Sequence, residues 1–115
     1  MMSDSLNIFF KKKILIYGLG KSGLSAFKFL KNKSNVFLYD DFQSNFKNLS
    51  IKKNFINYPN ILKSKFDQII LSPGIDFNNC KLSKYLKKNY NKIYSDLDVF
   101  YEFFKNDCIT ITGTN

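Results

Sequence analysis

The segment Gly18-Leu19-Gly20-Lys21-Ser22-Gly23 constrains this chain more than any other part of its sequence. It follows the apolar run Lys13 to Tyr17, which suits a strand buried on both faces, and it leads into Ser22 to Lys31, where apolar residues recur at helical spacing. A G-x-G-x-x-G pattern between a strand and a helix is typical of a nucleotide-binding turn. The first glycine permits the turn, the second lets a phosphate approach the backbone, and the third allows the helix to pack closely on the sheet.

Polar residues also end two later predicted strands. Val36 to Tyr39 is followed by Asp40-Asp41, and Phe66 to Leu71 is followed by Ser72-Pro73-Gly74. Because ligands bind at the carboxyl edge of open α/β sheets, we expect the site to combine the glycine turn with these residues: Gly18, Gly20, Lys21, Ser22, Gly23, Asp40, Asp41, Ser72 and Gly74. Without any binding role, Asp40 and Asp41 would be surface acids at a strand end and Ser72-Pro73-Gly74 an ordinary turn, and the sequence pattern would be the same. An acid after the second strand also fits an NAD-binding domain of a dehydrogenase or a regulatory nucleotide-sensing module.

The remaining segments complete an α/β pattern. Residues 42–65 are polar and rich in Asn, and we expect irregular structure with one short helix there. Leu82, Tyr85 and Leu86 mark the apolar face of a later helix, and Lys92 to Tyr94 predicts a short strand. The expected fold is therefore α/β and Rossmann-like, with a mainly parallel sheet and helices on both faces, formed by residues 1–94.

Residues 95–115 predict a connecting helix and the first strand of a further domain. Ser95 can cap a helix that has the acid Asp98 three residues later, and Cys108 to Thr112 is a β-rich run. The chain then stops at Gly113-Thr114-Asn115, so a strand and a glycine turn have no helix behind them.

Composition excludes several classes of function. The formal net charge is +9, but all 18 basic residues are scattered lysines, which favours a solvated surface over a nucleic-acid site. The chain has no His and only two Cys, so we expect no metal site, no disulfide framework and no catalytic constellation. Without a leader or an apolar stretch of about 20 residues, we expect a cytoplasmic protein that contacts no membrane.

Four motifs in order resemble the Mur ligase family, most closely its D-glutamate-adding branch. They are Tyr17-Gly18-Leu19-Gly20-Lys21-Ser22-Gly23-Leu24-Ser25, Leu71-Ser72-Pro73-Gly74-Ile75, Ser95-Asp96-Leu97-Asp98-Val99-Phe100 and Ile109-Thr110-Ile111-Thr112-Gly113-Thr114-Asn115. The resemblance spans the chain from the first strand to the last residue. Two positions depart from the family pattern: Phe42 stands where some relatives carry Arg, and Ser95 where the usual residue is Gly.

The resemblance implies a domain that binds the UDP part of UDP-N-acetylmuramoyl-L-alanine in an enzyme of peptidoglycan synthesis. It places Lys21 and Ser22 at the phosphate turn, Asp40 and Asp41 at the uridine, and Gly74 near the nucleotide. ATP with Mg²⁺ and D-glutamate would be bound by further domains, and the protein would be a monomer. The family continues Thr-Gly-Thr-Asn with Gly-Lys-[Ser/Thr], so Gly113, Thr114 and Asn115 would be part of an ATP-binding loop. We expect this chain alone to bind no ATP and to be inactive.

Overall fold

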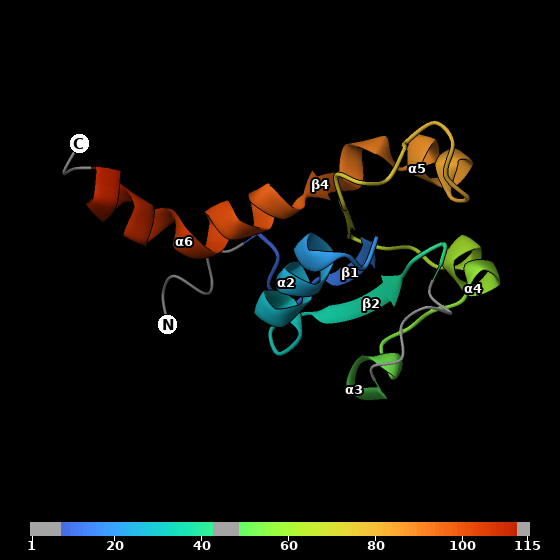
Figure 1. Cartoon of the computed structure of the whole chain (residues 1–115), viewed down its shortest axis with the longest axis horizontal. Coiled ribbons are helices and arrows are strands. Elements are labelled where there is room, and N and C mark those ends of the chain that lie inside the picture. The colour runs from blue at the N-terminus through green and yellow to red at the C-terminus, as the bar shows by residue number, and fades with distance from the viewer. Residues whose placement is uncertain (1–7, 43–48, 113–115) are drawn as a thin grey trace.

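The computed structural model describes residues 8–42 and 49–112 of the chain, and its centre is a parallel sheet (Figure 1). Four strands form the sheet in the order β2-β1-β3-β4: β1 (Lys13–Tyr17), β2 (Asn35–Tyr39), β3 (Gln68–Leu71) and β4 (Ile93–Ser95). All three pairings are parallel. The predicted parallel sheet is confirmed: β1 has its expected bounds, β2 begins one residue earlier and β3 two residues later than expected, and β4 lies one residue further along the chain.

Helices cover both faces of the sheet, so the side chains of β1, which point alternately to one face and the other, are all buried against helices. Ile14 and Ile16 belong to a core cluster shared with α2 (Lys21–Leu30) and with Val99 of α6 (Asp96–Thr112). Leu15 and Tyr17 belong to a second cluster, which contains residues of α4 (Tyr58–Lys63) and α5 (Ser83–Lys88). The predicted double-sided, Rossmann-like architecture is therefore confirmed.

The stretch between β2 and β3 has more structure than the sequence predicts. Two short helices lie there within the described residues, α3 (Leu49–Lys52) and α4, where one was expected. Between them Phe55 forms a single parallel bridge with Leu38, whose N–H donates to the Asn54 carbonyl at 2.8 Å. The segment is too short and polar for a periodic pattern, yet it makes one bridge to the edge strand β2.

The start of α6 follows the sequence prediction closely. Ser95 Oγ accepts a hydrogen bond from the Asp98 N–H at 3.2 Å, and Asp98 Oδ2 accepts one from the Ser95 N–H at 2.8 Å. This reciprocal pair is a capping box, which satisfies two donors at the helix end. The helix then packs on α2, where the Phe29 ring lies 5.5 Å from Phe100 and 5.3 Å from Phe103.

The predicted strand over Cys108 to Thr112 is wrong, because α6 continues as a helix to Thr112. In the part of the chain that the structure describes, the sheet ends at β4 and offers no strand beside these residues. Continuing the helix satisfies the backbone groups that an unpaired strand would leave without partners. The division of the chain at residue 94 stays a prediction.

Candidate functional site

The turn after β1 requires glycine at two of the three glycine positions of its G-x-G-x-x-G pattern. Gly18 has a φ of +100°, and a Cβ added there would lie 2.6 Å from Ser72 Cβ. A Cβ on Gly23 would lie 1.9 Å from the Gly18 carbonyl oxygen, so the helix can approach the turn only without a side chain. Gly20 is different, because a Cβ there would meet nothing within 4 Å. The space above Gly20 is open to a ligand.

The N-terminus of α2 faces this open space without a cap. Gly20 makes no side-chain cap hydrogen bond, and the first turn of α2 contains no acid. The Leu24 N–H donates to the Gly20 carbonyl at 3.0 Å, so the N–H groups of Lys21, Ser22 and Gly23 precede the first helical hydrogen bond. Such groups have no intrahelical acceptor, and the helix dipole adds a partial positive charge. With the exposed ammonium of Lys21 beside it, this helix end can bind an anion.

Asp40 braces the glycine turn through hydrogen bonds that the sequence did not predict. Its Oδ2 accepts from the Leu19 N–H at 2.7 Å, and its Oδ1 accepts from the Phe42 N–H at 2.8 Å. One half-buried carboxylate thus joins the end of β2 to the turn after β1. A carboxylate offers about four lone-pair positions, so this one side chain can accept hydrogen bonds from both N–H groups.

Asp41 links three segments at the same edge of the sheet. Its Oδ1 accepts a hydrogen bond from the Tyr17 hydroxyl at 2.8 Å, and its Oδ2 accepts one from the Lys81 N–H at 3.3 Å. Burial, together with the hydrogen bond to Asp41, raises the pKa of Tyr17 far above its ordinary value. The phenol therefore stays protonated and remains a donor. Sequence reasoning missed Tyr17 and Lys81, although a buried tyrosine that ends a strand does require a hydroxyl partner.

Ser72 lies directly against the glycine turn, whereas Gly74 is farther out. The Ser72 N–H donates a hydrogen bond to the Tyr17 carbonyl at 3.0 Å. In the turn that follows, the Ile75 N–H donates one to the Ser72 carbonyl at 3.1 Å. Gly74 is exposed, with no atom within 4 Å of where its Cβ would be. Because β2 and β3 lie on opposite sides of β1, Gly18 and Ser72 flank the switch point, where open α/β sheets bind ligands.

The structure therefore gathers most of the predicted residues at one edge. Gly113, Thr114 and Asn115 lie outside the described residues. Within the described ranges, no group of three or more His, Cys, Asp or Glu is placed to hold a metal ion. No helix among those same residues is long and apolar enough to span a bilayer.

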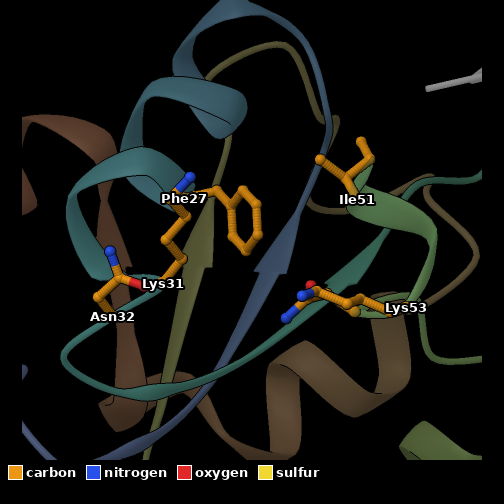
Figure 2. Close-up of a pocket in the computed structure, with 6 residues that line it drawn as sticks. Phe27, Lys31, Asn32, Ile51 and Lys53 are labelled. Atoms are coloured by element: carbon orange, nitrogen blue, oxygen red, sulfur yellow. The ribbon is translucent and has the colours of Figure 1, made fainter. Parts of the chain in front are cut away.

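A separate hollow lies away from the glycine turn. Figure 2 shows side chains from the C-terminal part of α2 on one side of it, and Ile51 of α3 and Lys53 after α3 on the other. It measures about 440 Å³ and is lined by Phe27, Lys31, Asn32, Ile51, Lys53 and Asn54. Phe27 and Lys31 stand at the C-terminal end of α2, whereas the turn stands at its N-terminal end. The hollow contains none of the predicted site residues.

Comparison with known proteins places this geometry in a family. A family model described as "Mur ligase MurD-like, N-terminal domain" matches residues 12–93. A relative from Rickettsia bellii named UDP-N-acetylmuramoylalanine--D-glutamate ligase is 37% identical over 110 residues, which cover 91% of this chain and 24% of the relative. The relative of that name from Aquifex aeolicus is 34% identical over 104 residues, covering 90% and 22%.

The relatives are much longer than this chain. A third protein of the same name, from Rickettsia prowazekii, is 37% identical over 115 residues, covering 96% of this chain and 25% of the relative. The chain thus spans about a quarter of the length of these curated relatives. No solved structure matches it. The family match extends from β1 to the start of β4 and includes the glycine turn, Asp40, Asp41 and Ser72, so the chain belongs to the MurD-like Mur ligases through their N-terminal domain.

Proposed function

We propose that this chain binds UDP-N-acetylmuramoyl-L-alanine for a ligase that adds D-glutamate during peptidoglycan synthesis. The observation that carries the proposal is the uncapped N-terminus of α2, which opens over Gly20 beside the carboxylate of Asp40. The names of the relatives give the substrate class, and the site offers groups suited to a uridine diphosphate.

The pyrophosphate fits the start of α2. In this arrangement it lies over Gly20 and accepts hydrogen bonds from the N–H groups of Lys21 and Ser22, with the ammonium of Lys21 balancing its charge. Gly20 has no side chain, so nothing within 4 Å obstructs that approach. Ser72 would border the ligand on the β3 side.

The uracil fits the Asp40 side of the turn. Uracil has one imide N–H donor, and a carboxylate can accept it. Asp40 already positions the turn through Leu19, so a base held by Asp40 and a pyrophosphate held by α2 would share one rigid support. Asp41 has both oxygens engaged by Tyr17 and Lys81, so we assign it to holding this edge together in addition to facing the uridine.

This chain spans about a quarter of the length of its relatives, and catalysis would require the parts of the ligase that correspond to the rest. In the full-length enzyme, the substrate carboxylate would take the γ-phosphoryl group of ATP with release of ADP, and the amine of D-glutamate would then displace inorganic phosphate from the acyl phosphate to form the amide bond. Within that scheme this domain contributes substrate binding through its own residues: donors at α2, an acceptor at Asp40 and the open space over Gly20.

Isothermal titration calorimetry with UDP-N-acetylmuramoyl-L-alanine and with NAD tests the proposal. We expect the UDP-sugar to bind the 115-residue chain more tightly than NAD does. Gly20→Ala should weaken this binding while lowering the melting temperature by only a few degrees, because the added methyl meets the ligand and not the protein. Binding of NAD at least as tight as that of the UDP-sugar would favour the dehydrogenase alternative.

A further inference from the structure

A surface groove lies between α4 and α5, and none of the glycine-turn residues line it. Both helices pack on the same face of the sheet, and Figure 1 shows them at the same end of the molecule. Two hollows of about 640 and 470 Å³ lie between their outer sides. The hollows share the lining residues Leu62, Lys84, Tyr85 and Lys87. We therefore treat them as one continuous space, the α4/α5 groove.

The side of the groove that α4 supplies is apolar. Leu62 is 50% exposed, so half of a large apolar side chain faces solvent beside the hollows. Tyr85 of α5 lies next to it, and its hydroxyl donates a hydrogen bond to the Ser64 carbonyl at the end of α4, at 3.1 Å. This bond joins the two helices, so the groove has a fixed width.

The side of the groove that α5 supplies is basic, and its own segment contains no acid to balance it. Residues 77–95 contain five lysines and no Asp or Glu, and residues 42–66, which include α4, contain no acid either. Lys84, Lys87 and Lys88 are exposed and line the larger hollow. Lys81 Nζ lies 5.0 Å from the centroid of the Tyr58 ring, an attraction that leaves its charge uncompensated. Such a surface attracts an anionic partner.

We propose that the α4/α5 groove binds a short acidic segment of a partner protein that presents a large apolar side chain. The apolar side chain would fill the hollow against Leu62 and Tyr85, and the acids beside it would meet the lysines of α5. Each half of such a segment matches a different side of the groove, which gives the contact both affinity and selectivity.

Other occupants match the groove less well. A bilayer surface is flat on the scale of two short helices and would leave the hollows unfilled. A second copy of this chain has a formal net charge of +9, so this basic face would repel it. A nucleic acid offers phosphates but no apolar side chain for Leu62, and the lysines lack the planar fork with which Arg binds phosphate.

Fluorescence anisotropy with labelled synthetic peptides tests the inference on the 115-residue chain, at about 0.15 M salt to screen long-range attraction. The probe peptide has a pair of leucines flanked by glutamates. One altered peptide has serines in place of the leucines, and another has glutamines in place of the glutamates. We expect the probe to bind and both altered peptides to bind about 10-fold more weakly or worse, because each keeps only one of the two matching features.

Two changes in the groove should weaken binding of the probe. The double variant Lys84→Gln/Lys87→Gln should raise its Kd by roughly 2- to 30-fold, the usual contribution of two exposed charge pairs. Leu62→Ser should raise it by roughly 5-fold, because less apolar surface is removed from water on binding. All three residues are exposed, so unchanged melting temperatures should confirm that these variants fold.

Matched control variants make the same chemical changes elsewhere. Lys52→Gln/Lys53→Gln removes two exposed charges at α3, so it lowers the net charge by the same amount as the α5 double variant. Leu97→Ser removes another exposed leucine, which lies on α6. Neither control should change the Kd of the probe by more than about 2-fold, because charges beyond a Debye length are largely screened.

Three results would overturn the inference. They are no binding of the probe, equally tight binding of the serine peptide, and an effect of the α3 double variant as large as that of the α5 double variant. Vesicles of equal parts phosphatidylcholine and phosphatidylglycerol test the bilayer alternative. If Lys84→Gln/Lys87→Gln weakened binding to the vesicles but not to the probe, this face would bind a membrane and the inference would be wrong.

The inference and the proposed function can fail separately. The α5 double variant and Leu62→Ser should leave the affinity for UDP-N-acetylmuramoyl-L-alanine unchanged, because these residues lie outside the glycine turn and its bracing acids. A lower affinity for the UDP-sugar in either variant would make the groove part of the substrate site and overturn its role as a separate docking surface. Loss of probe binding alone leaves the proposed function standing.

Discussion

Replacing Gly23 by Ala should disrupt the fold, whereas the same replacement at Gly20 should not. A Cβ at Gly23 would lie 1.9 Å from the Gly18 carbonyl oxygen, far inside van der Waals contact. The position of the Cβ is fixed by the backbone of Gly23, the oxygen is a backbone atom, and Gly18 is itself held by its N–H bond to the Tyr39 carbonyl at 2.9 Å. The helix or the turn must therefore move.

Overpacking of this kind costs about 1–3 kcal/mol, and we expect Gly23→Ala to fall near the upper end of that range. For a domain of this size, such a loss lowers the melting temperature by roughly 10 °C or more. Gly20→Ala adds a methyl group where nothing lies within 4 Å, so it should cost about 1 kcal/mol or less, mainly through the weaker helix cap.

Urea denaturation followed by circular dichroism measures both variants against the wild type at pH 7. The comparison is sharp because the two changes are chemically identical and lie three residues apart in one turn. If Gly23→Ala lost less than about 1 kcal/mol, or no more than Gly20→Ala, the close contact between α2 and the turn would not exist as described.

Three other results are expected from the hydrogen bonds at the sheet edge and at α6. Tyr17→Phe removes the donor to Asp41 Oδ1 and should lower the free energy of unfolding by about 1–2 kcal/mol at pH 7, measured by urea denaturation; an unchanged value would show that this bond contributes nothing. Because the pKa of Tyr17 is raised in the fold, the unfolded chain loses its phenolic proton first, so stability should fall as pH rises above the ordinary value of 10.0, and it should fall less steeply in Tyr17→Phe. Ser95→Ala removes half of the capping box with Asp98 and should cost about 0.5–2 kcal/mol in thermal or urea unfolding, whereas no loss would place the helix start elsewhere.

The sequence predicts the parts of this fold whose signals are local. The glycine turn, the buried strands and the capping box of Ser95 with Asp98 each depend on residues a few positions apart, and the structure has all of them. The strand end at Ser72 was also placed correctly beside the turn, because parallel strands bring their carboxyl ends to one edge.

Contacts between distant segments could not be predicted in the same way. Asp41 bonds to Tyr17 and Lys81, which are 24 and 40 residues away, and no spacing rule connects them. The bridge between Phe55 and Leu38 likewise depends on how the chain returns to β2. The error at Cys108 to Thr112 has another cause: β propensity indicates a strand only where a partner strand is available.

The central claim is that the N-terminus of α2 and the Asp40 side of the turn hold a uridine diphosphate. A titration of the isotope-labelled chain with UDP-N-acetylmuramoyl-L-alanine, followed through the backbone amide NMR signals, tests it most directly. We predict the largest shifts at Leu19, Lys21, Ser22 and Gly23, with little change at Lys31 and Lys53 in the separate hollow. Shifts centred on Lys31 and Lys53, or none at the glycine turn at saturating ligand, would contradict the claim.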